Sequence, residues 1–229
     1  MLNYMGKYIN KYKMNKVALK ICGITDVKSV ITAHKNKIKS LGFASNNLDG
    51  PNTANDKKIK NLIKECNYFK IESVLLTRYF SLNELVKQID YIKPKTISCS
   101  YHYPKSDLIK IKKIFKKLKI GVSVNHENFN KDYIHSIRKI VDVFYYDLNV
   151  YKKNNIKTYS IHKCIQQITF IKKIAKSIFI GGGVNEKNAK KIISIANPDG
   201  LDISRSLKGK KESLSQTKLK KFLSQVTAI

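Results

Sequence analysis

Arginine and acidic residues are scarce in this sequence, and its positive charge comes almost entirely from lysine. The 229 residues include 45 Lys and Arg but only 16 Asp and Glu, which gives a formal net charge of +29, and the arginines are Arg78, Arg138 and Arg205 alone. Proteins that bind phosphate backbones commonly use arginine for bidentate contacts and stacking. We therefore interpret the dispersed lysines as solvated helix faces and expect no specific nucleic-acid partner. A basic nucleic-acid-binding module is the remote alternative, and it rests on net charge alone.

Long apolar runs and metal-binding motifs are also missing. No stretch of about 18 consecutive apolar residues occurs, so we expect no membrane span. The four cysteines form no CxxC or Cys/His pair with metal-ligand spacing; they are Cys22, Cys66, Cys99 and Cys164. Free thiols in a reducing compartment are the expected state, because an α/β chain of this size does not need disulfides. We expect no metal site.

Residues 1–16 contain no acidic residue, no serine and no arginine. We interpret them as a basic, flexible N-terminal extension. Residues 17–229 are expected to form one domain, because an apolar fraction of 42% is enough for one sizeable core. We expect a cytoplasmic protein. The alternative is an organelle, with residues 1–16 as a presequence, although they lack the Ser, Arg and apolar segment that targeting sequences carry.

Eight short runs rich in β-branched apolar residues divide the sequence, each bounded by Gly, Pro, Asn or Asp, as strands usually are. The runs are Val17–Cys22, Ile38–Ala44, Ile71–Thr77, Thr96–Ser100, Ile120–Val124, Val141–Asp147, Ser177–Ile180 and Gly200–Ser204. The segments between them have apolar residues spaced about 3.6 apart, which predicts amphipathic helices. The clearest apolar stripe comprises Leu108, Ile111, Ile114, Phe115 and Leu118.

Several of these helical segments begin with recognisable start signals. Asp26 precedes the first helix, Ser81 with Glu84 fits a capping box, and Asn185 with Asn188 opens the seventh helix. Strands and helices that alternate in this way predict a parallel sheet covered by helices.

Eight strand–helix units fit either a closed (β/α)₈ barrel or an open doubly wound sheet. An open dinucleotide-binding sheet would place a glycine-rich turn directly after its first strand, but there the sequence reads Cys22-Gly23-Ile24-Thr25. The glycines follow the seventh strand instead, as Gly181-Gly182-Gly183. Phosphate sites in barrels are commonly built from the loops after strands seven and eight. This placement favours an α/β fold with a single (β/α)₈ TIM barrel of parallel strands.

The C-terminal ends of the strands are where such barrels carry their active sites. Cys22 ends the first strand and Asp147 ends the sixth. A thiol and a carboxyl facing each other across the barrel mouth make a usable base and acid, if burial separates their pKa values. Both residues have plainer interpretations: Cys22 as a small core residue, and Asp147 as a helix-capping or loop carboxylate.

The three glycines have a physical reason to bind an anion. Because no Cβ obstructs them, the backbone N–H groups of Gly181 to Gly183 can turn toward a negative charge. The helix that follows adds the partial positive charge of its N-terminus. A tight turn without a ligand is the alternative.

Four segments of the sequence share a pattern known from one family of barrel enzymes. These are the stretch Val17–Thr25, the triplet Leu41-Gly42-Phe43, the stretch Ile178–Asn185 and the stretch Gly200–Ser204. They resemble, in turn, the first-strand signature, the second-strand motif, the phosphate loop and the eighth strand of phosphoribosylanthranilate isomerase. The similarity runs from about Val17 to Phe222, and most of the middle matches only in pattern.

The resemblance implies an Amadori rearrangement in tryptophan biosynthesis. N-(5-phosphoribosyl)anthranilate, a phosphorylated sugar-amine, would become 1-(carboxyphenylamino)-1-deoxyribulose 5-phosphate without any metal or organic cofactor. It implies Asp147 as the general acid at the ring oxygen and the Cys22 thiolate as the general base at C2′. The residues expected to bind the phosphate are Gly181, Gly182, Gly183, Ser204 and Arg205. The further residues expected to bind substrate are Lys20, Arg78 and Asp202.

The sequence departs from the family pattern on the side that should hold anthranilate. The loop at residues 44–51 lacks the family's arginine for the anthranilate carboxylate, and residues 150–158 lack its glycine-rich lid. Arg78 or Arg205 would replace the missing cation, or else the substrate has changed. The alternative to the isomerase is therefore a barrel paralogue that binds or converts a different phosphorylated small molecule. We expect either a monomer or a homodimer.

Overall fold

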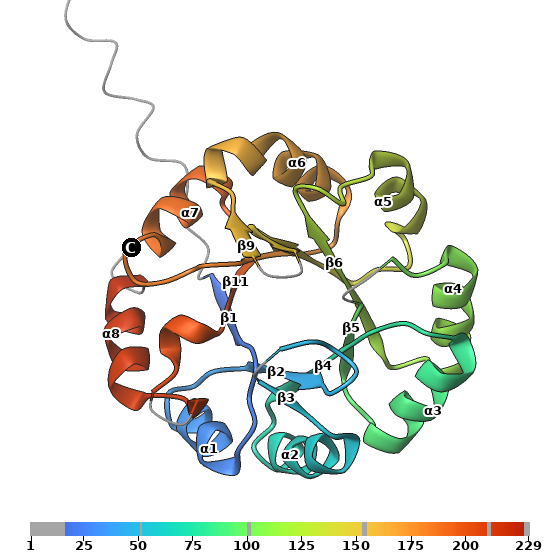
Figure 1. Cartoon of the computed structure of the whole chain (residues 1–229), viewed down its shortest axis with the longest axis horizontal. Coiled ribbons are helices and arrows are strands. Elements are labelled where there is room, and N and C mark those ends of the chain that lie inside the picture. The colour runs from blue at the N-terminus through green and yellow to red at the C-terminus, as the bar shows by residue number, and fades with distance from the viewer. Residues whose placement is uncertain (1–16, 51, 100–101, 153–154, 210–211, 227–229) are drawn as a thin grey trace, which may run out of the picture.

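Eight parallel strands close into a barrel, and helices form a ring around it (Figure 1). The computed structural model describes residues 17–50, 52–99, 102–152, 155–209 and 212–226. The expected N-terminal extension, residues 1–16, lies outside the described residues. The predicted (β/α)₈ fold is confirmed.

Each predicted run forms one barrel strand, with ends that differ by no more than two residues. In order around the barrel the strands are β1 Ala18–Ile21, β2 Ser40–Ser45, β4 Glu72–Thr77, β5 Thr96–Cys99, β6 Lys119–Asn125, β7 Val143–Asp147, β10 Ile178–Gly181 and β11 Gly200–Ile203. Strand β1 pairs with β11 on one side and with β2 on the other, which closes the sheet. Every pairing between neighbours around this ring is parallel.

One helix follows each barrel strand in the outer ring. The helices are α1 Val27–Lys35, α2 Asp56–Tyr68, α3 Leu82–Ile92, α4 Lys105–Ile114, α5 Lys131–Ile137, α6 Ile161–Ile174, α7 Ala189–Ala196 and α8 Gln216–Val226. Two predicted N-caps are confirmed. The Asp26 carboxylate accepts the Ser29 N–H at 2.8 Å, and the Ser81 hydroxyl accepts the Glu84 N–H at 3.3 Å.

The predicted start of α7 was wrong by one turn, because the helix begins at Ala189 rather than near Asn185. The Asn185 N–H donates to the side chain of Asn188 at 2.9 Å. Both asparagine side chains then donate to the Gly183 carbonyl oxygen, at 2.9 and 3.0 Å. These side-chain bonds stabilise a turn at the point where the sequence pattern indicated helix.

The predicted apolar stripe after β5 was also too long. Helix α4 ends at Ile114, whose side chain is 54% exposed. Leu118 is buried, but it lies in the turn before β6, where its N–H donates to the Phe115 carbonyl at 3.0 Å. The side chain therefore belongs to the core without belonging to the helix.

Side chains on the barrel strands alternate between two apolar clusters. Ile21 on β1, Phe144 on β7 and Leu201 on β11 belong to the large cluster that the strands share with the helices. A small separate cluster consists of Val74, Val143 and Tyr145. Because side chains alternate along a strand, the residues next to the first set face the barrel interior. The interior positions of β1, β7 and β11 include Lys20, Cys22, Asp147 and Asp202.

Three further elements decorate the C-terminal ends of the strands. Strand β3, Thr53–Ala54, adds to the end of β2. The hairpin of β8 (Asn149–Lys152) and β9 (Asn155–Thr158) follows β7, and the short helix η1, Arg205–Leu207, follows β11. In the part of the chain that the structure describes, no helix is long and apolar enough to cross a membrane.

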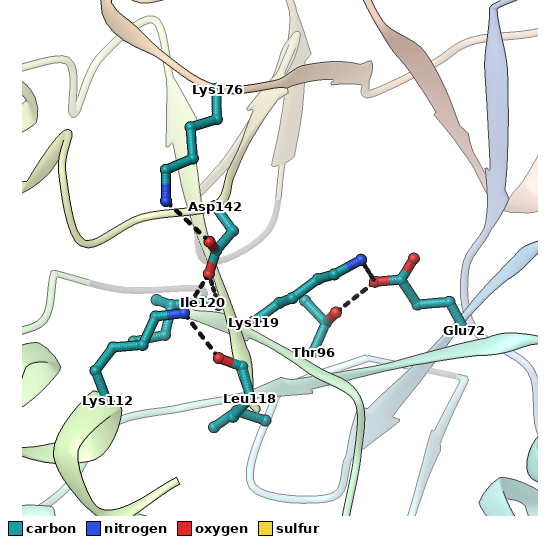
Figure 2. A network of polar contacts seen from close by, with 8 residues as sticks. All are labelled: Glu72, Thr96, Lys112, Leu118, Lys119, Ile120, Asp142 and Lys176. Carbon is teal, nitrogen blue, oxygen red and sulfur yellow. Dashed lines mark hydrogen bonds and ion pairs between the residues drawn. The ribbon is translucent and has the colours of Figure 1, made fainter. Parts of the chain in front are cut away.

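A network of ion pairs lies at the opposite end, where the strands begin (Figure 2). The Lys112 ammonium donates to the Asp142 carboxylate at 2.6 Å and to the Leu118 carbonyl at 2.8 Å. Lys176 reaches the other oxygen of Asp142 at 3.1 Å, and Lys119 binds Glu72 at 3.1 Å. These contacts connect α4 and the segment after α6 to the N-terminal ends of the strands. They lie away from the C-terminal strand ends that carry the candidate site.

Candidate active site

Cys22 lies at the C-terminal end of β1, on the interior side of the barrel. Its side chain is partly buried, and its backbone N–H donates to the Ile203 carbonyl at 2.7 Å. The thiol packs against the neighbouring strand β2, because a Cβ placed on Gly42 would stand only 2.7 Å from its sulfur. The glycine therefore makes room for the thiol at this end of the barrel.

A buried ion pair lies one position further down the same interior face. Lys20 on β1 and Asp202 on β11 are paired in register, and the ammonium reaches Asp202 Oδ2 at 2.6 Å. The Lys20 side chain is only 1% exposed and also lies 4.6 Å from the centre of the Tyr145 ring. The other carboxylate oxygen, Asp202 Oδ1, is buried without a hydrogen-bond partner among the described residues. Asp202 therefore keeps an open acceptor in the barrel interior.

The charges around Cys22 act in opposite directions. Burial raises the pKa of the Cys22 thiol, the Lys20 ammonium lowers it, and the Asp202 carboxylate raises it again, so that the pKa lies above its ordinary value. For Lys20, burial lowers the pKa, but the attraction of Asp202 and Cys22 outweighs burial and raises it. Lys20 thus stays charged, and it is the group that most opposes the effect of burial on the thiol.

Asp147 ends β7 across the barrel from β1. Burial raises the pKa of its carboxyl from the ordinary 3.8 to about 6. The Asn149 N–H, which donates to Asp147 Oδ1 at 2.8 Å, counteracts part of that rise. The Asp202 carboxylate adds to the rise, and Lys20 and Arg205 reduce it. The charges of Lys20 and Asp202 therefore influence the pKa of both Asp147 and Cys22.

The glycine run leaves β10 with two residues in the left-handed region. Gly182 has φ +82° and Gly183 has φ +73°. The carbonyl of Gly181 accepts the Leu148 N–H at 2.9 Å, which fastens this turn to the end of β7. Among the described residues, the N–H groups of Gly182 and Gly183 donate no hydrogen bond. These amides are therefore available to an acceptor from outside the chain.

Two more free amides follow the neighbouring strand. Ser204 and Arg205 lie where β11 passes into η1, and within the described part of the chain their N–H groups likewise have no acceptor. The side chain of Ser206 donates to the Val184 carbonyl at 2.8 Å, which holds this loop against the glycine loop. The predicted phosphate-binding residues are thus brought to two adjacent loops.

Arg78 directly follows β4, beside the loop that follows β2. Its guanidinium binds the Asp49 carboxylate at 2.7 Å and lies 6.0 Å from the centre of the exposed Phe80 ring. The loop is also fastened to β4 by Asn47, whose side-chain oxygen accepts the Arg78 N–H at 3.1 Å. Arg78, Phe80 and Asn47, with Ser45 and Gln88, line a cleft of about 250 Å³. The loop that lacks an arginine therefore receives one from the adjacent strand.

A hairpin, β8 with β9, follows β7 in the segment that lacks a glycine-rich lid in the sequence. The Thr158 hydroxyl donates to the Asn149 side chain at 2.7 Å, and Thr158 also lies next to Gly183. Tyr151 on β8 is 61% exposed, and its hydroxyl accepts a hydrogen bond from the Asn149 side-chain amide at 3.4 Å. The hairpin thus places an aromatic side chain beside the asparagine whose backbone N–H binds Asp147.

Two side chains in this region were not singled out from the sequence. Tyr145 lies two residues before Asp147 and so shares its interior face, a signal that strand alternation provides. Lys208 is buried and its ammonium donates to the Gly23 carbonyl. It lies in a loop without periodicity, so no sequence pattern indicated it. Within the described residues no cluster of His, Cys, Asp and Glu has the arrangement of a metal site.

The class that fold and site define is a (β/α)₈ barrel with a thiol, a carboxyl and two loops of free amides at the C-terminal ends of its strands. Solved structures with this fold include phosphoribosylanthranilate isomerases. That from Thermus thermophilus superposes with a TM-score of 0.74 at 13% identity, covering 93% of this chain and 99% of that one. That from Pyrococcus furiosus gives 0.72 at 15% identity, covering 93% and 100%.

The same barrel is shared by an enzyme of a different kind. A thiamine phosphate pyrophosphorylase from Pyrococcus furiosus superposes with a TM-score of 0.66 at 14% identity, covering 94% of this chain and 98% of that one. No protein-family model and no curated protein matches the sequence. At these identities the comparisons establish the fold, and the activity is argued from the site.

Proposed function

We propose that the chain is a cytoplasmic isomerase that converts N-(5-phosphoribosyl)anthranilate into 1-(carboxyphenylamino)-1-deoxyribulose 5-phosphate. The observation that carries the proposal is the pairing of a half-buried thiol with a carboxyl whose pKa is raised to about 6, at facing strand ends of one barrel. A carboxyl with that pKa keeps a useful protonated fraction near neutral pH, which a general acid needs.

The first step falls to Asp147. Its carboxyl donates a proton to the furanose ring oxygen, the C1′–O bond breaks, and the nitrogen lone pair forms the C1′=N bond of a Schiff base. The Asn149 N–H, bonded to Asp147 Oδ1 at 2.8 Å, holds the carboxyl in one orientation while its other oxygen carries the proton.

The second step falls to Cys22. Its thiolate removes the proton from C2′, the C2′–H electron pair forms the C1′=C2′ bond, and the iminium nitrogen becomes a neutral amine. The resulting enolamine takes up a proton at C1′ and releases the proton of its O2′ hydroxyl, so that the C1′=C2′ bond is replaced by the C2′=O bond of the ketone. No redox partner is needed, because one carbon is oxidised as its neighbour is reduced.

The remaining contacts would come from backbone amides and charged side chains near the C-terminal ends of the strands. The amides of Gly182, Gly183, Ser204 and Arg205 would bind the phosphate, and the exposed guanidinium of Arg205 adds positive charge. The buried and unpartnered Asp202 Oδ1 would accept a hydrogen bond from a sugar hydroxyl. Arg78, whose guanidinium binds the exposed carboxylate of Asp49, would exchange that partner for the anthranilate carboxylate.

Growth of a tryptophan-requiring strain that lacks this isomerase tests the proposal. The chain should restore growth without tryptophan, and Cys22→Ser and Asp147→Asn should not. Cys66→Ala is the matched control, because Cys66 is a buried residue of α2, away from the strand ends. This variant should still restore growth. A soluble, well-expressed chain that fails to restore growth would contradict the proposal.

That failure would favour a second candidate, a barrel that binds or converts a different phosphorylated small molecule. The specific observations in its favour are the Asp49–Arg78 contact in place of an arginine on the β2 loop and the structural likeness to a thiamine phosphate pyrophosphorylase. The phosphate-binding amides serve both candidates equally, so only the aglycone side distinguishes them.

A further inference from the structure

We propose that Lys20 is a positioning residue that sets the proton affinity of Cys22, in competition with Asp202 for the same ammonium group. The proposal rests on the proposed role of Cys22 as the base and adds a residue that acts through it. From the sequence we expected Lys20 to bind substrate; in this proposal it would instead act through Cys22 without touching substrate, because its side chain is 1% exposed beneath the strand ends.

The geometry gives Lys20 two possible anionic partners. It lies two residues before Cys22 on the same face of β1, and its register partner on β11 is Asp202. The ammonium reaches Asp202 Oδ2 at 2.6 Å, while Oδ1 of the same carboxylate has no partner among the described residues. The ring of Tyr145 closes the remaining side at 4.6 Å. The lysine is therefore enclosed by one carboxylate, one aromatic face and the strand that carries the thiol.

The titratable groups that face this cluster come from five segments. They are Lys20 on β1, Asp202 on β11, Tyr145 and Asp147 on β7, Tyr151 on β8 and Lys208 after η1. Of these, Lys20 lowers the pKa of the Cys22 thiol and Asp202 raises it. The thiol acts in turn on Lys208, where burial lowers the pKa of the ammonium and Cys22 raises it. Ionisation of the thiol therefore adds a negative charge that acts on both Lys20 and Lys208.

A requirement to fill the barrel interior does not explain why this position carries a lysine. Removing an ammonium from water costs several kcal/mol, and the neighbouring interior positions Val74 and Val143 are filled by apolar side chains. A buried ammonium in such an interior repays its cost only through the anions beside it. One of those anions is Asp202, and the other is the thiolate that the proposed reaction needs.

The pH dependence of Cys22 alkylation tests the proposal without any substrate. Iodoacetamide reacts with the thiolate, and mass spectrometry of the Cys22 peptide separates it from the three buried cysteines. Lys20→Met should move the midpoint of the rate profile upward by about one pH unit, with about a tenfold slower rate at pH 7. Lys20→Arg should have a midpoint close to that of the wild type, because arginine keeps the positive charge.

Asp202→Asn should move the midpoint in the opposite direction. It removes the carboxylate that raises the pKa of the thiol, and it releases Lys20 from its competing partner. If the ion pair had a purely structural role, Lys20→Met and Asp202→Asn should move the midpoint in the same direction. Both substitutions break the same contact and would destabilise the same part of the barrel. Opposite shifts support the proposal; shifts in one direction, or none, overturn it.

Lys112→Met is the matched control. Lys112 binds Asp142 at the same 2.6 Å, but at the other end of the barrel (Figure 2). Its loss should lower thermal stability and leave the Cys22 midpoint unchanged, and a midpoint that moved with Lys112 would overturn the proposal. If Lys20→Met does not fold, the midpoints of Asp202→Asn and Lys20→Arg still test the proposal. The first should move to lower pH, and the second should stay near that of the wild type. Because the alkylation needs no turnover, the expected shifts would stand even if the isomerase activity were absent.

Discussion

The carboxylate of Asp147 lies directly against the α-carbon of Gly182. Gly181 is the register partner of Asp147 across β10 and β7, so the chain turns away from β10 at the carboxylate. A Cβ on Gly182 would collide with Asp147 Oδ1 and with the backbone nitrogens of Leu148 and Asn149. The glycine loop thus does two things at once: it exposes amides, and it leaves room for the candidate acid.

Gly182→Ala should therefore cost more than the strain of its positive φ. Gly183→Ala is the matched control, because Gly183 has a similar φ of +73° but its Cβ would meet only ordinary contacts with Thr158 at 3.4 Å. We expect Gly183→Ala to lower the free energy of unfolding by about 1 kcal/mol and Gly182→Ala by about 2–3 kcal/mol. Denaturant titration measures both. Equal losses would mean that Asp147 does not need the space.

Asp147→Asn should stabilise the protein at neutral pH. The folded pKa of about 6 lies above the ordinary 3.8, so the folded state binds the proton more tightly, and wild-type stability falls as pH rises from about 4 to about 6. An asparagine avoids that loss, which is worth up to about 3 kcal/mol because one pKa unit corresponds to about 1.4 kcal/mol. Thermal melts should show the variant more stable above pH 6 and equal to wild type below pH 4. A less stable variant at pH 8 would contradict the raised pKa.

The pH profile of kcat/KM should have its acidic limb near pH 6. The reaction needs Asp147 protonated and Cys22 ionised, yet burial puts the pKa of Cys22 above that of Asp147. Below pH 6 the thiolate fraction falls tenfold per pH unit with no gain in protonated carboxyl. Above pH 6 the loss of protonated carboxyl cancels the gain in thiolate, so the rate is level until the thiol titrates. A rate that rose steadily from pH 6 to pH 9 would show that Asp147 is not the acid.

Arg78→Met should weaken substrate binding about 10- to 100-fold through KM, with a smaller effect on kcat, because a charge-assisted hydrogen bond is worth about 1.5–3 kcal/mol. Asp49→Ala should lower KM, since it removes the carboxylate that holds the guanidinium at 2.7 Å. Arg138→Met is the control, because Arg138 donates to the His135 carbonyl at the end of α5. If Arg78→Met left KM unchanged, another residue would have to hold the carboxylate.

Local periodicity was enough to predict eight alternating strands and helices, and the glycines after the seventh strand favoured the closed barrel over an open sheet. Each strand is a short β-branched run, and the alternation that buries Ile21 outside the barrel turns Lys20 and Cys22 inside. The position of the glycine run at the C-terminal ends of the strands was predictable for the same reason, because Gly181 directly follows the predicted strand Ser177–Ile180. Caps that depend on adjacent residues, such as Asp26 with Ser29, were also predictable.

Features that depend on competition between local hydrogen bonds, or on contacts between distant segments, could not be predicted. The start of α7 is shifted by asparagine side chains that bind the Gly183 carbonyl, which competes with helical hydrogen bonding. The hairpin of β8 and β9 replaces a glycine-rich lid, and its sequence carries no strong turn signal. Arg78 meets Asp49 only because β2 and β4 are neighbours around the barrel, and Lys208 reaches Gly23 only through closure of the chain.

Turnover of N-(5-phosphoribosyl)anthranilate by the purified chain tests the central claim most directly. The substrate is fluorescent and the product is not, so the reaction can be followed as a loss of fluorescence. We expect wild type to turn over, Cys22→Ser and Asp147→Asn each to lose activity at least about 100-fold, and Cys66→Ala to keep it. Fluorescence that decays no faster with folded wild-type protein than without it, at any pH between 6 and 9, would contradict the assignment of this barrel as the isomerase.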